Sequence, residues 1–262
     1  MQLESTILNT LDEQTRAGGG WLLFDFTGAS EHLHRVRHVV CGLHREHQLH
    51  LVDFVERSES ETLDLLHGSP ADIAASLVSM LPPVQLDNPG AMYYRQKAYD
   101  AFEALLGALQ ASGESITFSR LSMLLMSSSA IRDLEARVRK CDNAAYQRLV
   151  SFLDELHSGN PPTAHAEAFR VNEVLGGAAG RIAQLWQGGL GAILDSPQPG
   201  IRISAVVEAN RMLYVRLPAY EALAQQIARL ISSELTNSLK LVGGEPTSEQ
   251  TGRPFLKFEL FA

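Results

Sequence analysis

The chain has 262 residues, 45% of them hydrophobic, and a formal net charge of −8 at pH 7. This length and composition predict a soluble globular protein with a substantial core, in about one or two domains. The acidic balance excludes a general electrostatic attraction to nucleic-acid phosphates or anionic lipid, so any DNA contact has to be local.

The sequence also indicates a cellular compartment. No apolar stretch reaches the roughly 18 residues of a membrane span, and the start Met1-Gln-Leu-Glu lacks the basic residues of a secretory signal. Cys41 and Cys141 form no C-x-x-C pattern. We therefore expect a cytoplasmic protein with free thiols.

Helices and short apolar strands alternate at the start of the chain. Apolar residues at helical spacing predict a helix over 1–15, which Gly18-Gly19-Gly20 ends, and a second helix over about 31–46. Apolar runs at 21–26 and 50–54 predict buried strands. Helices that alternate with buried strands predict a parallel sheet covered on both faces.

The middle of the chain shows helical periodicity and little that resembles a strand. The expected helices cover 71–81, 91–111, 118–126, 131–139 and 144–156, with breaks at Pro82-Pro83 and Asn88-Pro89-Gly90. A long helical stretch over 164–187 follows, and we expect an interruption at Gly176-Gly177. This block predicts an all-α domain inserted into an α/β unit.

The strand pattern returns near the C-terminus, where expected strands over 211–217 and 255–261 flank an amphipathic helix over 220–241. The sequence therefore predicts an α/β protein with three layers and a mostly parallel sheet. We expect the α/β domain to comprise residues 1–62 and 196–262, and the all-α insertion domain to comprise residues 63–195.

Several segments, taken in their order along the chain, carry a resemblance to a known family. They are Met1–Leu8, Trp21–Gly28, Gly68–Leu81, Asn88–Ala98, Ile203–Pro218 and Gly252–Glu259. Together they resemble the TraD-like coupling ATPases of conjugation and type IV secretion, within the FtsK/HerA-type P-loop ATPases. The first looks like the helix directly after the Walker A loop, the second like the strand before the family's Asp-Pro-Lys-Gly-Asp turn, and the last like the approach to Walker B.

The resemblance implies a RecA-like ATPase fold for the α/β domain. In the intact family ATP and Mg²⁺ are the cofactors, and a membrane-tethered hexamer drives DNA or protein substrates to a secretion channel. The implied partners are further copies in a homo-oligomeric hexamer or the intact coupling ATPase, together with secretion substrates, adaptors and DNA. The implied location is the cytoplasmic face of the bacterial inner membrane.

Each nucleotide motif departs from the family pattern. The chain has no G-x-x-x-x-G-K-[ST] loop, whose backbone N–H groups and Lys would hold the phosphates. In the second motif Asp25 and Gly28 match, but Thr27 stands in place of the Lys and Ala29 in place of the second acid. The last strand offers Glu259 as a single acid in a shifted position. The nucleotide-binding candidates are therefore Asp25, Gly28 and Glu259, and we expect no catalytic residue and no cofactor in this chain alone.

These candidates also have structural interpretations. Asp25 fits a polar residue at the end of a strand, and Glu259 alternates with Lys257 as on the solvated face of an edge strand. Arg181 could serve a neighbouring subunit as an arginine finger, which stabilises charge on a transferring phosphoryl group. An ordinary surface arginine is the alternative.

Two further groups of side chains allow a binding role. His34, His38 and Cys41 share a helix face, a spacing that can present three metal ligands, but no fourth ligand is indicated, so a solvated helix and no metal site are expected. A basic group on one expected helix could contact DNA or an adaptor, although interleaved acids favour a solvated face. Its members are Arg132, Arg137, Arg139 and Lys140.

Two functions follow from this pattern. The first is a part or degenerate paralogue of a coupling ATPase, with its phosphate loop encoded upstream and its Walker B acids downstream, and inactive as an isolated chain. The second is a non-enzymatic adaptor or scaffold that binds substrates or the intact motor, because the altered turn at 25–28 is internal. Antiparallel strands, or a helix 1–15 packed away from Trp21, would instead indicate an unrelated α/β protein.

Overall fold

The computed structural model describes residues 2–83, 88–157, 164–196, 200–219, 222–241 and 255–261. The chain divides into two compact units. Unit 1 comprises Met1–Leu65 and Ala192–Ala262, and unit 2 comprises Leu66–Gly191. The sequence pattern predicted boundaries at 62/63 and 195/196.

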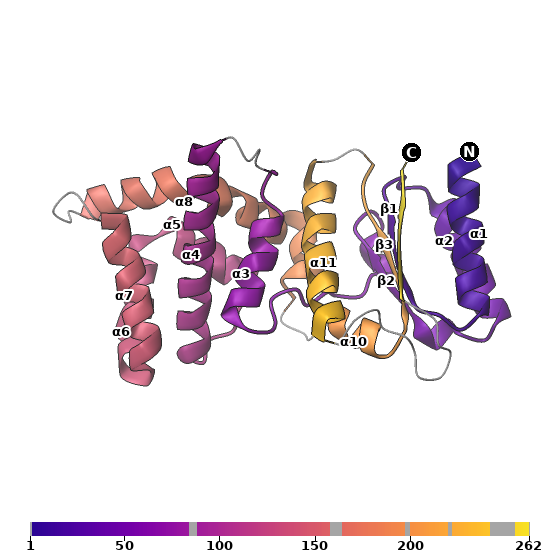
Figure 1. Ribbon diagram of the computed structural model, residues 1–262, viewed down its shortest axis with the longest axis horizontal. Coiled ribbons are helices and arrows are strands. Elements are labelled where there is room, and N and C mark those ends of the chain that lie inside the picture. The colour runs from indigo at the N-terminus through magenta and orange to yellow at the C-terminus, as the bar shows by residue number, and fades with distance from the viewer. Residues whose placement is uncertain are drawn as a thin grey trace. The chain divides into compact units, whose positions relative to one another are not determined.

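Unit 1 contains all the described strands, with helices between them (Figure 1). Its main elements are α1 (Gln2–Arg16), β1 (Trp21–Asp25), α2 (Ser30–Gly42), β2 (Leu49–Asp53), α10 (Ile203–Glu208), β3 (Met212–Arg216), α11 (Ala222–Leu241) and β4 (Leu256–Leu260). Short 3₁₀ turns lie at Glu46–Gln48 and Arg57–Glu59, and the short helix α9 covers Gly191–Leu194. The expected strands are confirmed, with ends that differ by one residue.

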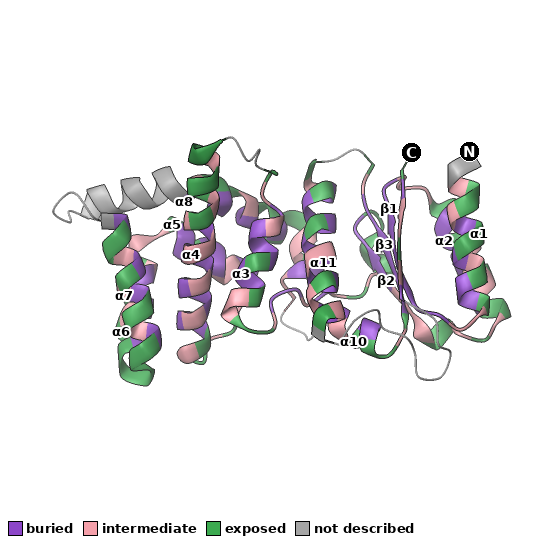
Figure 2. Cartoon of the chain, viewed as in Figure 1, coloured by how far each residue is buried: buried purple, intermediate pink, exposed green. Residues whose placement is uncertain are grey.

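The sheet has the order β2-β3-β1-β4, and every pair of neighbours is parallel. The central strands β1 and β3 are buried along their whole length (Figure 2), as expected for near-continuous apolar runs covered on both faces. The prediction of an α/β fold with a parallel sheet is therefore confirmed.

Helices cover the sheet on both faces (Figure 1). On one side, here called the α1 face, Leu8 and Leu11 of α1 and Val36 of α2 form one apolar cluster with Trp21 and Tyr214 of the sheet. On the other side, the α11 face, lie α10 and α11. This arrangement agrees with right-handed crossovers, because the connection through α2 and the connection through α11 run in opposite directions along the sheet.

The second expected helix ends earlier than the sequence predicted. Periodicity indicated a helix over about 31–46, but α2 stops at Gly42. The reason is local, because His44 has a φ of 55°, in the left-handed region that ends an α-helix. Residues 43–45 of the predicted range lie outside any helix, and Glu46 begins the 3₁₀ turn Glu46–Gln48 that leads into β2.

The described elements of unit 2 are all helices, joined by short loops. It contains α3 (Pro70–Ser79), α4 (Pro89–Ala111), α5 (Phe118–Met126), α6 (Ser128–Cys141), α7 (Asn143–His157) and α8 (Ala164–Trp186), with a 3₁₀ turn at Gly188–Leu190. Several helices start at a side chain that accepts a hydrogen bond from a backbone N–H of the first turn, the usual N-cap. These caps are Ser69, Asn88, Thr117 and Ser127.

The expected interruption at Gly176-Gly177 is wrong, because α8 continues through both glycines to Trp186. Leu175, Ala178 and Ile182 on this helix are buried. Burial of this apolar stripe stabilises the helix and outweighs the low helix propensity of glycine, about 1 kcal/mol per residue. Across the described residues of the chain, no helix combines the length and the apolar character that crossing a bilayer requires.

Candidate functional site

Asp25 and Arg216 lie at the carboxyl ends of β1 and β3, the two central strands, and are register partners. The connection after β1 runs to β2 at one edge of the sheet. The connection after β3 runs to β4 at the opposite edge. In α/β proteins such a change of direction between neighbouring strands opens a crevice at their carboxyl ends, where ligands bind. This end of the sheet is therefore the candidate functional site.

The carboxylate of Asp25 is fully buried and is bonded from several sides. Its Oδ1 accepts the backbone N–H of Thr27 at 2.9 Å and the Thr27 hydroxyl at 2.6 Å. Its Oδ2 accepts the Tyr214 hydroxyl, and Nδ1 of His32 lies 3.3 Å from the same oxygen. Because internal donors occupy both oxygens, a Mg²⁺ ion or a nucleotide could bind Asp25 only by displacing one of them.

His32 connects this carboxylate to α1. The side chain lies on α2 and is nearly buried, and its Nε2 contacts the carboxylate of Glu4 in the first turn of α1. The ring of His32 thus joins the carboxylates of Glu4 and Asp25 and links α1, α2 and β1. We call Glu4, Asp25, Thr27, His32 and Tyr214 the Asp25 cluster.

Tyr214 acts as a donor to this cluster. Burial raises the pKa of Tyr214 far above its ordinary value, and the charge of Asp25 and the hydrogen bond between them raise it further. The phenol therefore stays protonated near neutral pH and keeps its hydrogen directed at Asp25. It positions the carboxylate and is unsuited to acid or base chemistry.

A nucleophilic role for Thr27 is not supported by the geometry. The Thr27 hydroxyl lies 3.1 Å from Nδ1 of His32, so hydroxyl, imidazole and the Glu4 carboxylate form a row, as in activated nucleophiles. However, the hydroxyl has one hydrogen, and its 2.6 Å contact with Asp25 is the shorter and charge-assisted one. The Asp25 cluster is therefore built to hold the end of the sheet together.

Gly28 belongs to the same end of the sheet, where Arg216 holds it. The Gly28 carbonyl accepts Nε of Arg216 at 3.1 Å and Nη2 at 2.5 Å. Nη1 of the same guanidinium donates to Asp53 at the end of β2 at 3.1 Å. Gly28 has a φ of 68°, which favours glycine over other residues. The turn after β1 is thus fastened to β3 and β2 by a single buried arginine.

Glu259 lies apart from these residues. Asp25 is in register with Leu260 on β4, so the alternation of side chains places Glu259 on the opposite face of the sheet. There its Oε1 accepts Nζ of Lys257 at 2.6 Å, and both side chains are partly exposed. The structure therefore brings Asp25 and Gly28 together at one end of the sheet, and leaves Glu259 outside.

The remaining candidates lie elsewhere. Arg181 is on α8 in unit 2, half-buried. Of the basic group on α6, Arg137 donates to Glu114 at 2.7 Å, and Arg120 of α5 donates to the same carboxylate at 2.6 Å. Burial by itself raises the pKa of Glu114, but the charges and hydrogen bonds of the two arginines outweigh it and hold the pKa below its ordinary value. These contacts stabilise unit 2 and leave Arg137 occupied.

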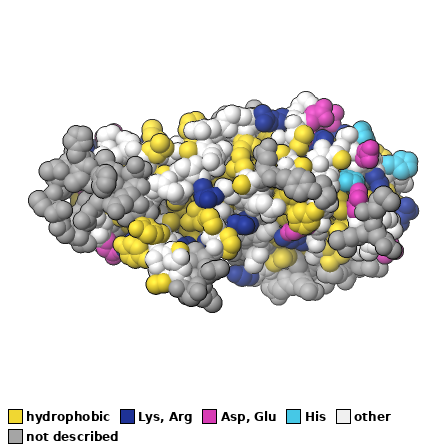
Figure 3. All heavy atoms as spheres, turned by 90° about the horizontal axis from the view of Figure 1, so that it is seen from above, with side chains coloured by type: hydrophobic (Ala, Val, Ile, Leu, Met, Phe, Trp, Pro, Cys, Tyr) yellow, Lys and Arg dark blue, Asp and Glu magenta, His cyan; other side chains and the backbone are white. Residues whose placement is uncertain are grey.

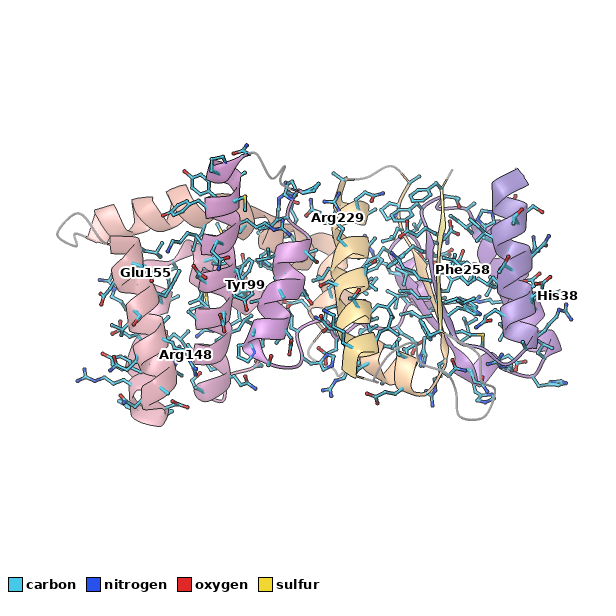
Figure 4. All side chains as sticks on the ribbon, in the orientation of Figure 1. His38, Tyr99, Arg148, Glu155, Arg229 and Phe258 are labelled. Carbon is cyan, nitrogen blue, oxygen red and sulfur yellow. The ribbon has the colours of Figure 1, made fainter. Side chains whose placement is uncertain are left out.

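Histidine side chains gather on the surface of unit 1 near α1 and α2 (Figure 3). His34, His38 and Cys41 are exposed on α2, and His38 lies on its outer side (Figure 4). Within the described residues, no three His, Cys, Asp or Glu side chains are arranged to hold a metal ion.

Sequence reasoning missed four members of this site: Glu4, His32, Tyr214 and Arg216. Two of them left a signal, because Tyr214 and Arg216 occupy alternate positions of an otherwise apolar strand and so point to the same face as each other. Glu4 and His32 lie on amphipathic helices. Polar residues are common on such helices, so the sequence alone does not show that these two face the sheet.

A scan against models of protein families found no match to the chain, and neither did a search of curated proteins.

Proposed function

We propose that unit 1 is a RecA-like ATPase-type domain, and that the chain is part, or a degenerate paralogue, of a type IV coupling ATPase that brings DNA or protein substrates to a secretion or conjugation channel. The observation that carries the proposal is the position of α1. Its first turn lies at the carboxyl end of β1, where Glu4 reaches His32 beside Asp25. In P-loop proteins the phosphate loop directly precedes such a helix, whose N-terminus favours phosphate.

Two other features support the same proposal. All neighbouring strands are parallel, and α1 packs on the face of the sheet that carries Trp21. Both features are what the family resemblance of the segments described above leads us to expect. Unit 2 would then be the all-α insertion domain that contacts substrates or adaptors. Arg181 could act as an arginine finger only toward a neighbouring subunit that has a complete site.

The second candidate function, a non-enzymatic adaptor or scaffold, is favoured by the state of the Asp25 cluster. Both carboxylate oxygens are used by internal donors, and Thr27 binds Asp25 where the family's Lys would reach a phosphate. On this account the chain recruits substrates or the intact motor at the inner face of the membrane through protein contacts. Neither version of the proposal gives the isolated chain ATPase activity.

The coding sequence directly before Met1 separates the two versions. An in-frame G-x-x-x-x-G-K-[ST] there, together with Mg²⁺-dependent ATP binding by the chain extended to include it, would support a piece of a motor. Absence of an in-frame loop, with binding of the chain to an intact coupling ATPase in a purified mixture, would support the adaptor. If an in-frame loop is found but the folded, extended chain binds no ATP, the coupling-ATPase proposal fails.

A further inference from the structure

The two edges of the sheet in unit 1 differ in how their backbone groups are satisfied. At the β2 edge, the N–H of Leu51 donates to the Glu61 carboxylate at 3.0 Å and the N–H of Asp53 donates to the Ser60 hydroxyl at 2.9 Å. The Leu51 carbonyl accepts the N–H of Glu61 at 2.9 Å. These contacts close the edge, because the groups that a further strand would need are already bonded.

The β4 edge is open within the described part of the chain. Leu256 donates to the Gly20 carbonyl at 3.3 Å and the Leu260 carbonyl accepts Phe26 at 2.9 Å, so the even-numbered residues of β4 bond toward β1. In a parallel strand the alternate residues direct their N–H and C=O to the other side. None of the described residues bonds to the backbone of Lys257 or Glu259. An exposed row of this kind is a template for another strand.

We propose that the β4 edge pairs with the β4 edge of a second copy of this chain, antiparallel and centred on Phe258. In that register Lys257 faces Glu259 of the second copy, and the reverse pair forms on the other side of the two-fold axis. Residues opposed in this way exchange their N–H and C=O groups. The pairing uses the outward groups of β4 and leaves every bond between β4 and β1 in place.

The side chains of β4 are complementary to themselves in this register. On the α11 face, Lys257 and Glu259 already contact each other within one chain, and in the pair each would find the opposite charge across the interface. On the α1 face, Phe258 would lie opposite Phe258 of the second copy, and Leu256 opposite Leu260 of that copy. Phe258 is partly buried on this face, on the side of the sheet toward α1 (Figure 4).

Charge and closure both favour a second copy over other strands. Lysine on an edge strand normally discourages pairing, but here each lysine is matched by a glutamate in the same strand. A two-fold antiparallel contact also consumes both open edges, so it stops at a dimer and cannot grow into a fibre. The inference concerns the edge of β4 in the 262-residue chain and uses no step of the proposed function.

Sedimentation velocity of the 262-residue chain from about 1 to 200 μM tests this proposal. We expect a reversible rise from 28.7 kDa to twice that mass. Lys257→Glu should weaken the dimer about tenfold or more, because both cross-strand charge pairs become repulsive. The double variant Lys257→Glu/Glu259→Lys restores both pairs with reversed signs and should regain the dimer.

A proline variant gives a second readout that does not depend on charge. Glu259→Pro removes an N–H that points away from β1, a position where edge strands tolerate proline, so the fold should persist while the dimer is lost. Unchanged fluorescence of the buried Trp21 would verify the fold. The proposal is overturned if the wild-type chain stays at 28.7 kDa throughout, or if it dimerises equally well with Lys257→Glu and Glu259→Pro.

Discussion

The bond between Tyr214 and Asp25 can be removed with almost no change in the shape of the core. Tyr214→Phe deletes only the hydroxyl, and Tyr214 is fully buried, so no water can replace the lost donor without rearrangement. Oδ2 of Asp25 then keeps His32 as its remaining neighbour in the cluster, at 3.3 Å. Losing a hydrogen bond to a buried carboxylate should lower the free energy of unfolding of unit 1 by about 1.5–3 kcal/mol.

Urea unfolding measured by tryptophan fluorescence is the assay. Trp21 is buried in unit 1 and Trp186 lies in unit 2, so a Trp186→Phe background makes the signal report on unit 1. With a urea dependence of about 2 kcal/mol per molar, the midpoint should fall by about 1 M. Tyr94→Phe is the matched control, because Tyr94 is 49% exposed and should change the free energy by less than about 0.5 kcal/mol.

The pairwise energy comes from a double-mutant cycle with Asp25→Asn. If the hydroxyl stabilises the fold through the carboxylate, Tyr214→Phe should cost clearly less in the Asp25→Asn background than in the wild type. A midpoint shift no larger than that of Tyr94→Phe would refute the reasoning. Equal costs of Tyr214→Phe in both backgrounds would also refute it.

Two other predictions concern backbone conformation and pH. Gly28→Ala should destabilise unit 1 by about 1 kcal/mol, because Gly28 has a φ of 68°. Gly177→Ala should stabilise unit 2 by up to about 1 kcal/mol, because Gly177 is an exposed helical residue where an added Cβ meets no atom within 4 Å. Thermal unfolding of both variants checks this, and shifts in the same direction would contradict it. Because its two arginines lower the pKa of Glu114, this group stabilises unit 2 above its ordinary pKa and loses that contribution as pH falls through the lowered value. Urea titrations between about pH 6 and 3 should show a smaller pH dependence for Glu114→Gln, and an unchanged dependence would contradict the assignment.

Local patterns in the sequence were sufficient for most elements of the fold. Short apolar runs predicted each described strand, because a strand buried on both faces needs continuous apolar residues. Local patterns failed where packing or a single backbone angle decided the outcome. Burial of Leu175 and Ile182 keeps α8 continuous across its glycines, and the left-handed conformation of His44 shortens α2.

The candidate site was predictable only in part, because its contacts join distant segments. Asp25 and Gly28 stood out from the sequence, but Tyr214 is 189 residues from Asp25 along the chain. Their contact depends on the register between β1 and β3, which neither strand encodes by itself. The position of Glu259 on the opposite face follows from the same register. A sequence pattern can show that a strand ends in an acidic residue. It does not show which side chains will donate hydrogen bonds to that carboxylate.

We propose that the Asp25 cluster fills the end of the sheet where a nucleotide would bind, so that the isolated chain acts through protein contacts. Calorimetric titration of the purified chain with ATP and Mg²⁺, at a stated salt concentration of about 0.15 M, tests this most directly. We expect no binding heat at ATP concentrations up to about 1 mM. Micromolar, Mg²⁺-dependent binding that Asp25→Asn weakens would contradict it.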